Sequence, residues 1–566
     1  MFCKLPICYP ATGKPTFSFS PCSHHPQKTA MSGWMQTGRN DHRVYVRPLG
    51  LNELSFYYDS HFNGTADILT YTTIQVPAEG ASYINPENVT RTWCALKSRF
   101  PLLGATIQLH NSLPQFVVAE ERLKSIAPSE ILFSSVPSVE EARNAADVEL
   151  HGKRKLSDDL LARLVVQSRA DAPSTYHVLI HIAHLITDGV GNASLLGELL
   201  RLLSSQGDHS VPNLEARLSL AVAAESLVPI VKMSVARQRW RRAAGQIIRQ
   251  LQDAKRTGGQ TLPRFYGPIA TRLPARSGCL RVAPLFCAGE SLPIMQNLRK
   301  HGLSVGNALP VLAQVAMARV LSRRYVRGEI GAEEWDFRKK QPYHTAGPID
   351  LRPFLDKSWY RNGGQTNVSL NIGFFYFTLG FTSLGPPNLA PGDSPPEFGE
   401  LMTPERFWLR CNRMKKLASV YLNHPLLFEI GEARLADKIT NSRQVAAKWE
   451  KDPESYVRPG EVEEQNVSAI DQIKRGTVMS HGWSSFKDVF KSSHESLIRL
   501  EEVQQWLHCR TGELYLGAGS YGGGLYLLLY FDANVFSEET VQEWVEETKE
   551  AMAWYLCETQ ALTSKL

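Results

Sequence analysis

The feature that most constrains the fold is a buried strand that turns directly into a helix near residue 184. Residues 176–183 read YHVLIHIA, a largely apolar run of the kind that favours a strand. Residues 192–203 carry leucines at helical spacing, and the turn between the two segments holds His184 and Asp188. This order predicts an α/β fold, in which polar side chains at the ends of strands are frequent catalytic groups.

His184 and Asp188 are the residues of this turn with evident chemistry. An imidazole titrates near neutrality, so His184 suits general-base catalysis. Asp188 suits a structural role, because its carboxylate can accept hydrogen bonds from the turn or pair with an arginine. Gly189 is expected to give the turn a positive φ. The alternative is a solvent-facing histidine beside an ordinary turn aspartate; strand alternation puts His177 and His181 on the other face, where we expect packing roles.

The rest of the chain shows the same mixture of strand-like and helix-like segments. Alternating or continuous apolar runs predict strands at residues 67–76, 104–109, 115–119, 366–379 and 525–531. Apolar faces and capping residues predict helices at residues 86–99, 305–321 and 537–554. At 566 residues the chain is long enough for two such α/β regions.

The predicted organisation has four parts. Residues 1–40 are rich in Pro, Ser, Thr, Cys and His and are expected to form a mobile tail. An N-terminal lobe is expected over residues 41–260, ending in a basic helical connector that is either a solvated face or a contact for anions or a membrane surface. A C-terminal lobe is expected over residues 261–563, and residues 564–566 form a separate signal.

Composition argues against several kinds of partner. The chain has 62 Lys and Arg against 56 Asp and Glu, and this net charge of +6 is too small to indicate nucleic acid. The nine cysteines form no CxxC pair and no zinc-like spacing with histidine, so no metal site is expected. The chain has no apolar run of about 18 residues, which argues against a membrane span, and its first residues lack the apolar core of a signal peptide.

The chain closes on Ser564, Lys565 and Leu566. A C-terminal Ser-Lys-Leu is an address that the peroxisomal import receptor reads. We therefore expect a peroxisomal protein that has this receptor as a partner.

Residues 184–189, HLITDG, resemble the HxxxDG active-site motif of the CoA-dependent acyltransferase superfamily, which includes chloramphenicol acetyltransferase. Within it, the chain resembles the fungal trichothecene O-acetyltransferase family, also through residues 51–56 (LNELSF), 100–103 (FPLL), 348–353 (PIDLRP) and 478–482 (VMSHG). The resemblance covers most of residues 44–555 and implies a two-lobed chloramphenicol acetyltransferase-like fold. Each lobe would be a mixed sheet flanked by helices, with the active-site channel between the lobes.

Motifs of two other branches of the superfamily are absent, and one nucleotide-binding pattern occurs in the wrong structural context. Plant members of the superfamily carry DFGWG, which is absent here, and condensation domains carry two adjacent histidines where this chain has Ala183 before His184. Residues 517–522 match GxGxxG, but an apolar strand follows them instead of a helix. We expect a hairpin loop there and no dinucleotide site.

The resemblance implies roles for five residues. His184 would remove the proton of an alcohol and then protonate the departing CoA thiolate, while Asp188 would be structural. Arg352 would brace Asp188 from the second lobe, next to Asp350 in the same segment. Ser480 would donate a hydrogen bond to the tetrahedral oxyanion; the alternative is an ordinary serine at a strand end.

The resemblance also implies the substrates. Acyl-CoA is the expected co-substrate, no cofactor is expected to stay bound, and the acceptor is a small-molecule alcohol or a glycolipid. The peroxisomal tripeptide combined with HxxxDG resembles the acyltransferases of fungal mannosylerythritol lipid synthesis, which favours short- or medium-chain acylation of sugar hydroxyls. The alternatives are acetylation of a trichothecene-like sesquiterpene alcohol and a non-catalytic acyl-CoA- or lipid-binding relative.

Overall fold

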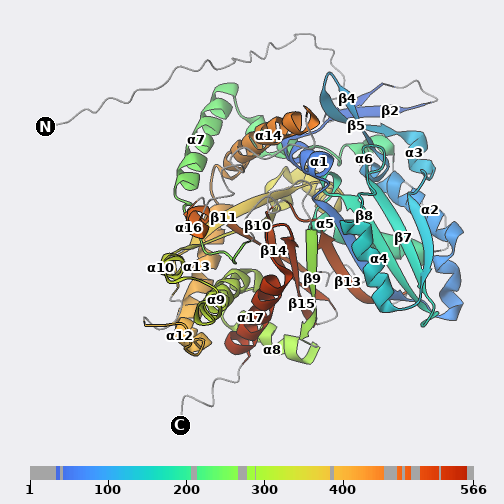
Figure 1. The fold of residues 1–566 in the computed structure, drawn as a ribbon. Coiled ribbons are helices and arrows are strands. Elements are labelled where there is room, and N and C mark those ends of the chain that lie inside the picture. Colours follow the sequence, from blue (N-terminus) through green and yellow to red (C-terminus); the bar gives the residue numbers. More distant parts are fainter. Residues whose placement is uncertain are drawn as a thin grey trace.

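The structure is a computed structural model. It describes residues 33–37, 42–205, 213–264, 277–286, 288–382, 388–451, 468–474, 478–485, 498–510, 512–521 and 524–557. Two lobes lie side by side, each built on a mixed sheet with helices packed against it (Figure 1).

The N-terminal lobe is built on a five-stranded sheet in the order β13-β3-β8-β7-β6. Its strands are β3 (Asp67–Gln75), β6 (Ile131–Val136), β7 (Ala162–Arg169), β8 (Thr175–Ala183) and β13 (Arg499–Leu507). All neighbours are antiparallel except β6 and β7, so the sheet is mixed. The strands predicted over residues 67–76 and 176–183 are thereby confirmed to within one residue.

Alternate residues of β3 and β8 separate two apolar layers. On one face, Ile68 and Ile180 join a core with helices α1 (Leu51–Asn63), α2 (Pro86–Arg99) and α5 (Gly189–Leu203). On the other face, Leu69 and Leu179 pack with α4 (Val139–His151) and with Leu528 of the second lobe. The sheet is thus covered on both sides, and its second face forms part of the junction between the lobes.

A small antiparallel sheet, β1-β2-β5-β4, flanks this lobe. It consists of β1 (Met35–Gln36), β2 (Val44–Pro48), β4 (Thr106–His110) and β5 (Leu113–Ala119). The expectation of an unstructured tail up to residue 40 is wrong at residues 33–37. Trp34 is 4% exposed, its indole N–H donates to the carbonyl of Ala221 at 2.9 Å, and the Arg47 guanidinium lies over its ring. Residues 1–32 and 38–41 lie outside the described residues, as do residues 564–566.

The C-terminal lobe contains a six-stranded mixed sheet in the order β11-β10-β12-β14-β15-β9. Its strands are β9 (Ser277–Phe286), β10 (Tyr343–Asp350), β11 (Ile372–Leu379), β12 (Val478–Ser485), β14 (Leu514–Tyr521) and β15 (Gly524–Asp532). Helices α8 (Ala288–Lys300), α9 (Val305–Val326) and α17 (Glu538–Leu556) share its apolar core. By length and composition α9 is apolar enough to cross a bilayer, but 89% of its apolar window is buried inside the protein.

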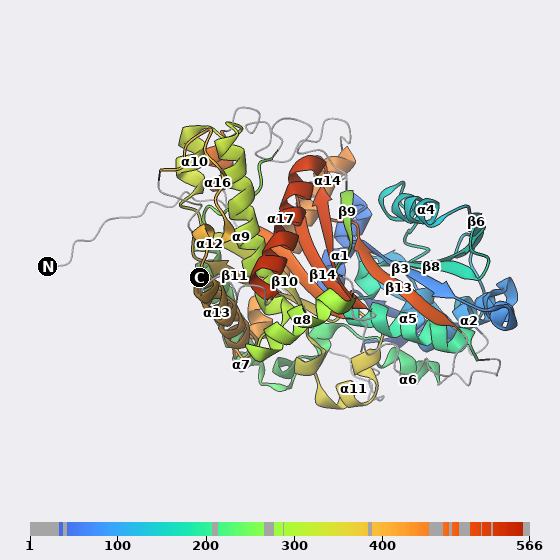
Figure 2. The same ribbon diagram turned by 90° about the horizontal axis from the view of Figure 1, so that it is seen from below.

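One strand of the C-terminal half belongs to the N-terminal sheet. β13 pairs antiparallel with β3 from Arg499↔Gln75 to Leu507↔Ile68, and Figure 2 shows it beside β3 and β8. A division of the chain at residue 260 therefore does not divide the two sheets. A hairpin loop was expected at residues 517–522, but residues 517–521 lie inside β14, which pairs antiparallel with β15, and Gly522 lies outside the described residues.

The basic segment 216–256 is not one continuous helix. α6 (Leu214–Leu218) and α7 (Val235–Ala254) are separated by short 3₁₀ turns, one of which begins at Pro229. α7 packs against α14 (Leu427–Lys451) at the edge of the molecule (Figure 1). The remaining helices are α3 (Glu120–Lys124), α10 (Ala332–Arg338), α11 (Lys357–Arg361), α12 (Phe398–Leu401), α13 (Pro404–Leu422) and α16 (Ala469–Lys474).

Candidate active site

His184 begins a single 3₁₀ turn, His184–Ile186, immediately after the last residue of β8. Its Nδ1 lies 2.8 Å from the carbonyl oxygen of Thr187. A carbonyl only accepts hydrogen bonds, so Nδ1 carries the proton and donates it. Nε2 is then left with its lone pair, and the described residues give it no partner. This is the tautomer that a general base requires.

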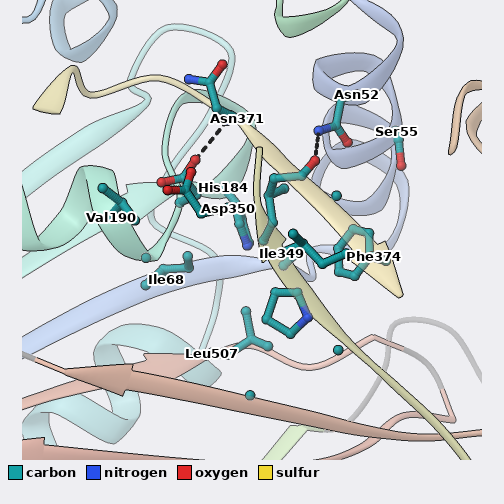
Figure 3. Close-up of a pocket in the computed structure, with 18 of the residues that line it drawn as sticks. Asn52, Ser55, Ile68, His184, Val190, Ile349, Asp350, Asn371, Phe374 and Leu507 are labelled. Atoms are coloured by element: carbon teal, nitrogen blue, oxygen red, sulfur yellow. Dashed lines mark hydrogen bonds between the residues drawn. The ribbon is translucent and has the colours of Figure 1, made fainter. Parts of the chain in front are cut away.

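The ring of His184 is fixed by an aromatic neighbour. The Phe56 ring on α1 lies 4.1 Å away between centroids, at an interplanar angle of 36°. Figure 3 shows the imidazole extending toward the space bordered by Ile68, Ile349 and Leu507. Burial and then the Arg510 guanidinium lower the pKa of His184 to about 4, so the imidazole is neutral at neutral pH.

Asp188 is the N-cap of α5 and is fully engaged in hydrogen bonds. Its Oδ1 accepts from the backbone N–H of Gly191 at 2.9 Å, and its Oδ2 accepts from that of Asn371 at 2.7 Å. Nη1 of Arg352 lies 2.9 Å from both carboxylate oxygens. Asp188 is buried and directed away from Nδ1 of His184, whose partner is Thr187, so its geometry is that of a brace.

Arg352 lies in a 3₁₀ turn just after β10 and is also buried. Its Nη2 donates to the carbonyls of Asn367 and Ser369, at 3.2 and 3.0 Å. Its Nη1 and backbone N–H both lie 3.1 Å from Oδ1 of Asp350. The structure thus brings together the two sequence segments that the resemblance paired, although they are 164 residues apart.

Gly189 does not do what the sequence suggested. It is the first residue of α5, and its φ lies outside the left-handed region. A Cβ added there would meet only Oε1 of Gln505, at 3.7 Å. Gly191 is the crowded position, because a Cβ would lie 2.9 Å from Oγ1 of the buried Thr187. Asp188 caps the helix, so the chain enters α5 without a left-handed residue and Gly189 needs no positive φ.

Asp350 and Ser480 both line the cavity around His184. Asp350 ends β10, and burial raises the pKa of its carboxyl group. Ser480 lies in β12, in register with Ala346 of β10 and Tyr515 of β14. His177 and His181 are held elsewhere, as expected: His177 bonds Tyr71 at 2.9 Å. His181 bonds Glu149 at 2.8 Å.

A charged cluster beside His184 was not predicted from the sequence. Asp59 of α1 accepts hydrogen bonds at 2.6 Å from Nζ of Lys438 on α14 and from Nε of Arg510 after β13. Both cations lie over the Phe56 ring, with Lys438 Nζ at 5.5 Å and the Arg510 guanidinium carbon at 4.8 Å from its centroid. The only local signal was Phe56 itself, which falls in the LNELSF segment; the charges come from distant parts of the chain.

These residues surround a cavity of about 1540 Å³ that both lobes line. Apart from the charged residues next to His184, such as Asp188 and Arg510, its charged lining forms two groups on different helices. Near α2, α5 and α6 lie Arg99, Arg201 and Arg217 with one carboxylate, Glu198. At the α7–α14 side lie Arg249, Arg256 and Arg434 with two carboxylates, Asp253 and Asp437. The described residues hold no cluster of His, Cys, Asp and Glu that suits a metal ion.

The fold and this site can now be compared with known proteins. No protein-family model and no curated protein matches the sequence. Solved structures do match: TRI3 trichothecene 15-O-acetyltransferase from Fusarium sporotrichioides aligns over 94% of this chain and 99% of its own, at 14% identity and a TM-score of 0.62. The condensation domain of the monacolin K polyketide synthase MokA aligns over 90% and 97%, at 12% identity and 0.51.

A third structure adds a ligand. The starter condensation domain of rhizomide synthetase RzmA, solved as a point mutant in complex with C8-CoA, aligns over 90% of this chain and 95% of its own, at 10% identity and a TM-score of 0.52. These likenesses confirm the predicted fold: two lobes of mixed sheets flanked by helices, in the arrangement seen in TRI3 and in the condensation domains. At 10–14% identity, the likeness to these structures shows the fold alone.

Proposed function

We propose that the protein is an acyl-CoA-dependent O-acyltransferase. The observation that carries the proposal is the state of His184: Nδ1 is held by the Thr187 carbonyl, while Nε2 has a lone pair in a cavity shared by the two lobes. A neutral imidazole held in one tautomer at the end of a strand is suited to taking a proton from a hydroxyl group. The acyltransferase fold and the C8-CoA bound to RzmA support this choice.

The reaction runs in two steps without a covalent enzyme intermediate. Nε2 of His184 removes the alcohol proton as the alcohol oxygen attacks the thioester carbonyl carbon. The resulting tetrahedral oxyanion collapses, the C–S bond breaks, and the imidazolium returns the proton to the CoA thiolate. The products are an ester and free CoA, and the histidine is neutral again.

The oxyanion needs a hydrogen-bond donor, and Arg510 is a stronger candidate than Ser480. Ser480 lines the cavity with a neutral hydroxyl. Arg510 lies beside His184 with Nε bonded to Asp59, while its Nη1 is 3.9 Å from Glu513, beyond hydrogen-bond distance. A charged donor makes a hydrogen bond roughly twice as strong as a neutral one. Ser480→Ala should therefore reduce kcat less than Arg510→Gln does.

The charged lining supports an orientation for acyl-CoA. The CoA phosphates are anionic, and the α2–α5–α6 side of the cavity has three cations for one carboxylate. The α7–α14 side, with Lys438 and its partner Asp59 included, has four cations for three carboxylates. Phosphates at the first side would leave the second for the acceptor. Arg201→Gln should then raise the KM for acyl-CoA with kcat little changed, whereas Arg249→Gln, the matched variant of the other side, should leave that KM unchanged.

The acceptor is an alcohol, and two classes are in question. The sequence favours a sugar hydroxyl of a mannosylerythritol-type glycolipid, which the comparisons do not support. A sesquiterpene alcohol is supported by the likeness to TRI3, a trichothecene 15-O-acetyltransferase. Purified protein should be given acetyl-CoA or octanoyl-CoA with deacylated mannosylerythritol or a trichothecene alcohol, and CoA release measured. Acceptor-dependent release with one class identifies it; no acceptor-dependent release with any pair contradicts the proposed reaction.

Import into the peroxisome belongs to the same proposal. It rests on Ser564, Lys565 and Leu566, which lie outside the described residues. Protein tagged at its N-terminus should enter peroxisomes, and deletion of the three residues should leave it in the cytosol. Continued import of the deleted form would contradict the assignment.

A further inference from the structure

α7 has two faces, and only one of them is used inside the protein. On the inner face, Gly245 packs directly against Glu429 of α14, and Arg241 pairs with the same glutamate. A Cβ at residue 245 would come within 2.7 Å of the Glu429 Cβ, so the two helices are in close contact. This packing fixes which side of α7 faces outward.

The outer face carries a stripe of large apolar side chains. Trp240 is 67% exposed, Ile247 is 57% exposed and Leu251 is 58% exposed. These positions are seven and four residues apart, so they lie on one side of the helix, and Ala236 and Ala243 continue the stripe. A Trp and an Ile exposed together on a helix are uncommon in a surface that faces only water.

Basic side chains flank this stripe. Arg237, Arg239 and Arg242 are exposed, and the first acidic residue of the helix is Asp253, near its end. Arg242 pairs with Glu432, while no ion pair is seen for Arg237 or Arg239 among the described residues. Two copies of this face would bring like charges together, so a second copy of the chain is a poor occupant. A negatively charged surface with an apolar interior matches both features.

The position of α7 connects this face with the cavity. Arg249 and Asp253, on the side of the helix turned to α14, line the cavity, so α7 forms part of its wall. Figure 1 shows α7 at the outer edge of the molecule beside α14. A body bound through the outer face of α7 would therefore be separated from the cavity by one helix.

We infer that the outer face of α7, defined by Trp240, Ile247, Leu251, Arg237 and Arg239, docks on the surface of an anionic lipid bilayer. The apolar stripe inserts at the level of the headgroups, where Trp is a favoured side chain, and the arginines bind lipid phosphates or carboxylates. Docking would hold the protein at the lipid–water interface, where a lipophilic acceptor or product is concentrated. The inference does not depend on the proposed reaction.

Vesicle co-sedimentation tests the inference with the full chain. The protein should sediment with vesicles of equimolar phosphatidylserine and phosphatidylcholine, and much less with phosphatidylcholine alone. Each basic residue near an anionic surface contributes on the order of 1 kcal/mol, so Arg237→Gln with Arg239→Gln should weaken binding by roughly tenfold or more. Trp240→Gln with Ile247→Gln should weaken it similarly, and added salt should weaken the wild type.

Two matched variants locate the surface. Leu109→Gln alters a side chain in the β4–β5 hairpin that is as exposed as Trp240, at 67%, and should leave binding unchanged. Leu409→Gln alters an exposed leucine on the basic helix α13 and should also have no effect. The inference is overturned if the wild type does not sediment with anionic vesicles, if the α7 variants bind as well as the wild type, or if only Leu409→Gln loses binding. Light scattering that shows a dimer lost in Trp240→Gln would assign the face to a second copy instead.

Discussion

One guanidinium nitrogen of Arg352 lies 2.9 Å from both carboxylate oxygens of Asp188, so a buried ion pair joins the C-terminal lobe to the loop that holds His184. Breaking a buried pair by removing one partner leaves an uncompensated charge and typically costs about 3–5 kcal/mol. We predict that Asp188→Ala lowers the free energy of unfolding by this amount in urea denaturation and also reduces turnover, because the loop after β8 loses its brace.

A surface pair provides the control for this prediction. Lys232 and Asp356 lie 2.6 Å apart, but the lysine side chain is largely exposed. Lys232→Ala should change the free energy of unfolding by less than about 1 kcal/mol. Equal effects of the two variants would show that the Asp188–Arg352 pair is no more important for stability than an exposed one.

The pH dependence of the reaction should report the environment of His184. Burial and Arg510 lower the pKa of His184 to about 4, and only the neutral imidazole acts as a base. The rate constant kcat/KM should therefore stay level from neutral pH downward and fall only as the pH approaches 4. Arg510→Gln removes a positive charge next to the imidazole, so the acid limb should move to higher pH. A limb near pH 6.5 in the wild type, or no movement in the variant, would contradict this account of the electrostatics.

The two glycines of the loop should respond oppositely to alanine. Gly189→Ala should leave the free energy of unfolding within about 0.5 kcal/mol of the wild type, because its Cβ has room and alanine favours the helix. Gly191→Ala forces a Cβ against the buried hydroxyl of Thr187, which also bonds Asn192 at 2.6 Å. Overpacking of this kind costs about 1–3 kcal/mol. Thermal denaturation of both variants decides the point, and a destabilised Gly189→Ala protein would restore the turn role expected from the sequence.

Acyl transfer should proceed without an acyl-enzyme. No cysteine lines the described cavity, and His184 has no hydroxyl or thiol partner among the described residues. A covalent mechanism would need a nucleophile within hydrogen-bond reach of the base. Intact-protein mass spectrometry after incubation with acyl-CoA and no acceptor should show the unmodified mass. A stoichiometric increase by one acyl group would refute direct transfer.

Local signals in the sequence were enough to predict where several helices begin and end. Asn85 accepts from the N–H of Asn88 and Pro86 is the first helical residue, so α2 runs from Pro86 to Arg99 as predicted. Ser537 likewise caps α17. α9 begins at Val305, as predicted, with Pro310 inside the helix. The helix is buried in the C-terminal core, and this packing outweighs the hydrogen bond that Pro310 cannot donate.

Contacts between residues far apart in the sequence could not be predicted from the sequence. Nothing in residues 499–507 indicates that they pair with residues 67–75 of the other lobe, because strand pairing over such a separation leaves no local pattern. Asp59 and Lys438 are 379 residues apart and meet beside Phe56 only in the folded chain. Single charged residues are common on any surface, so Arg510 could not be distinguished from the other arginines before the structure placed it against His184.

The central claim is that His184 is the base of acyl transfer, and one kinetic comparison tests it most directly. Acceptor-dependent CoA release should be measured for the wild type, for His184→Ala and for His301→Ala, which alters an exposed histidine away from the cavity. We expect His184→Ala to lose about 10²–10⁴-fold in kcat with an unchanged melting temperature, while His301→Ala keeps its activity. A folded His184→Ala protein with wild-type turnover would contradict the central claim.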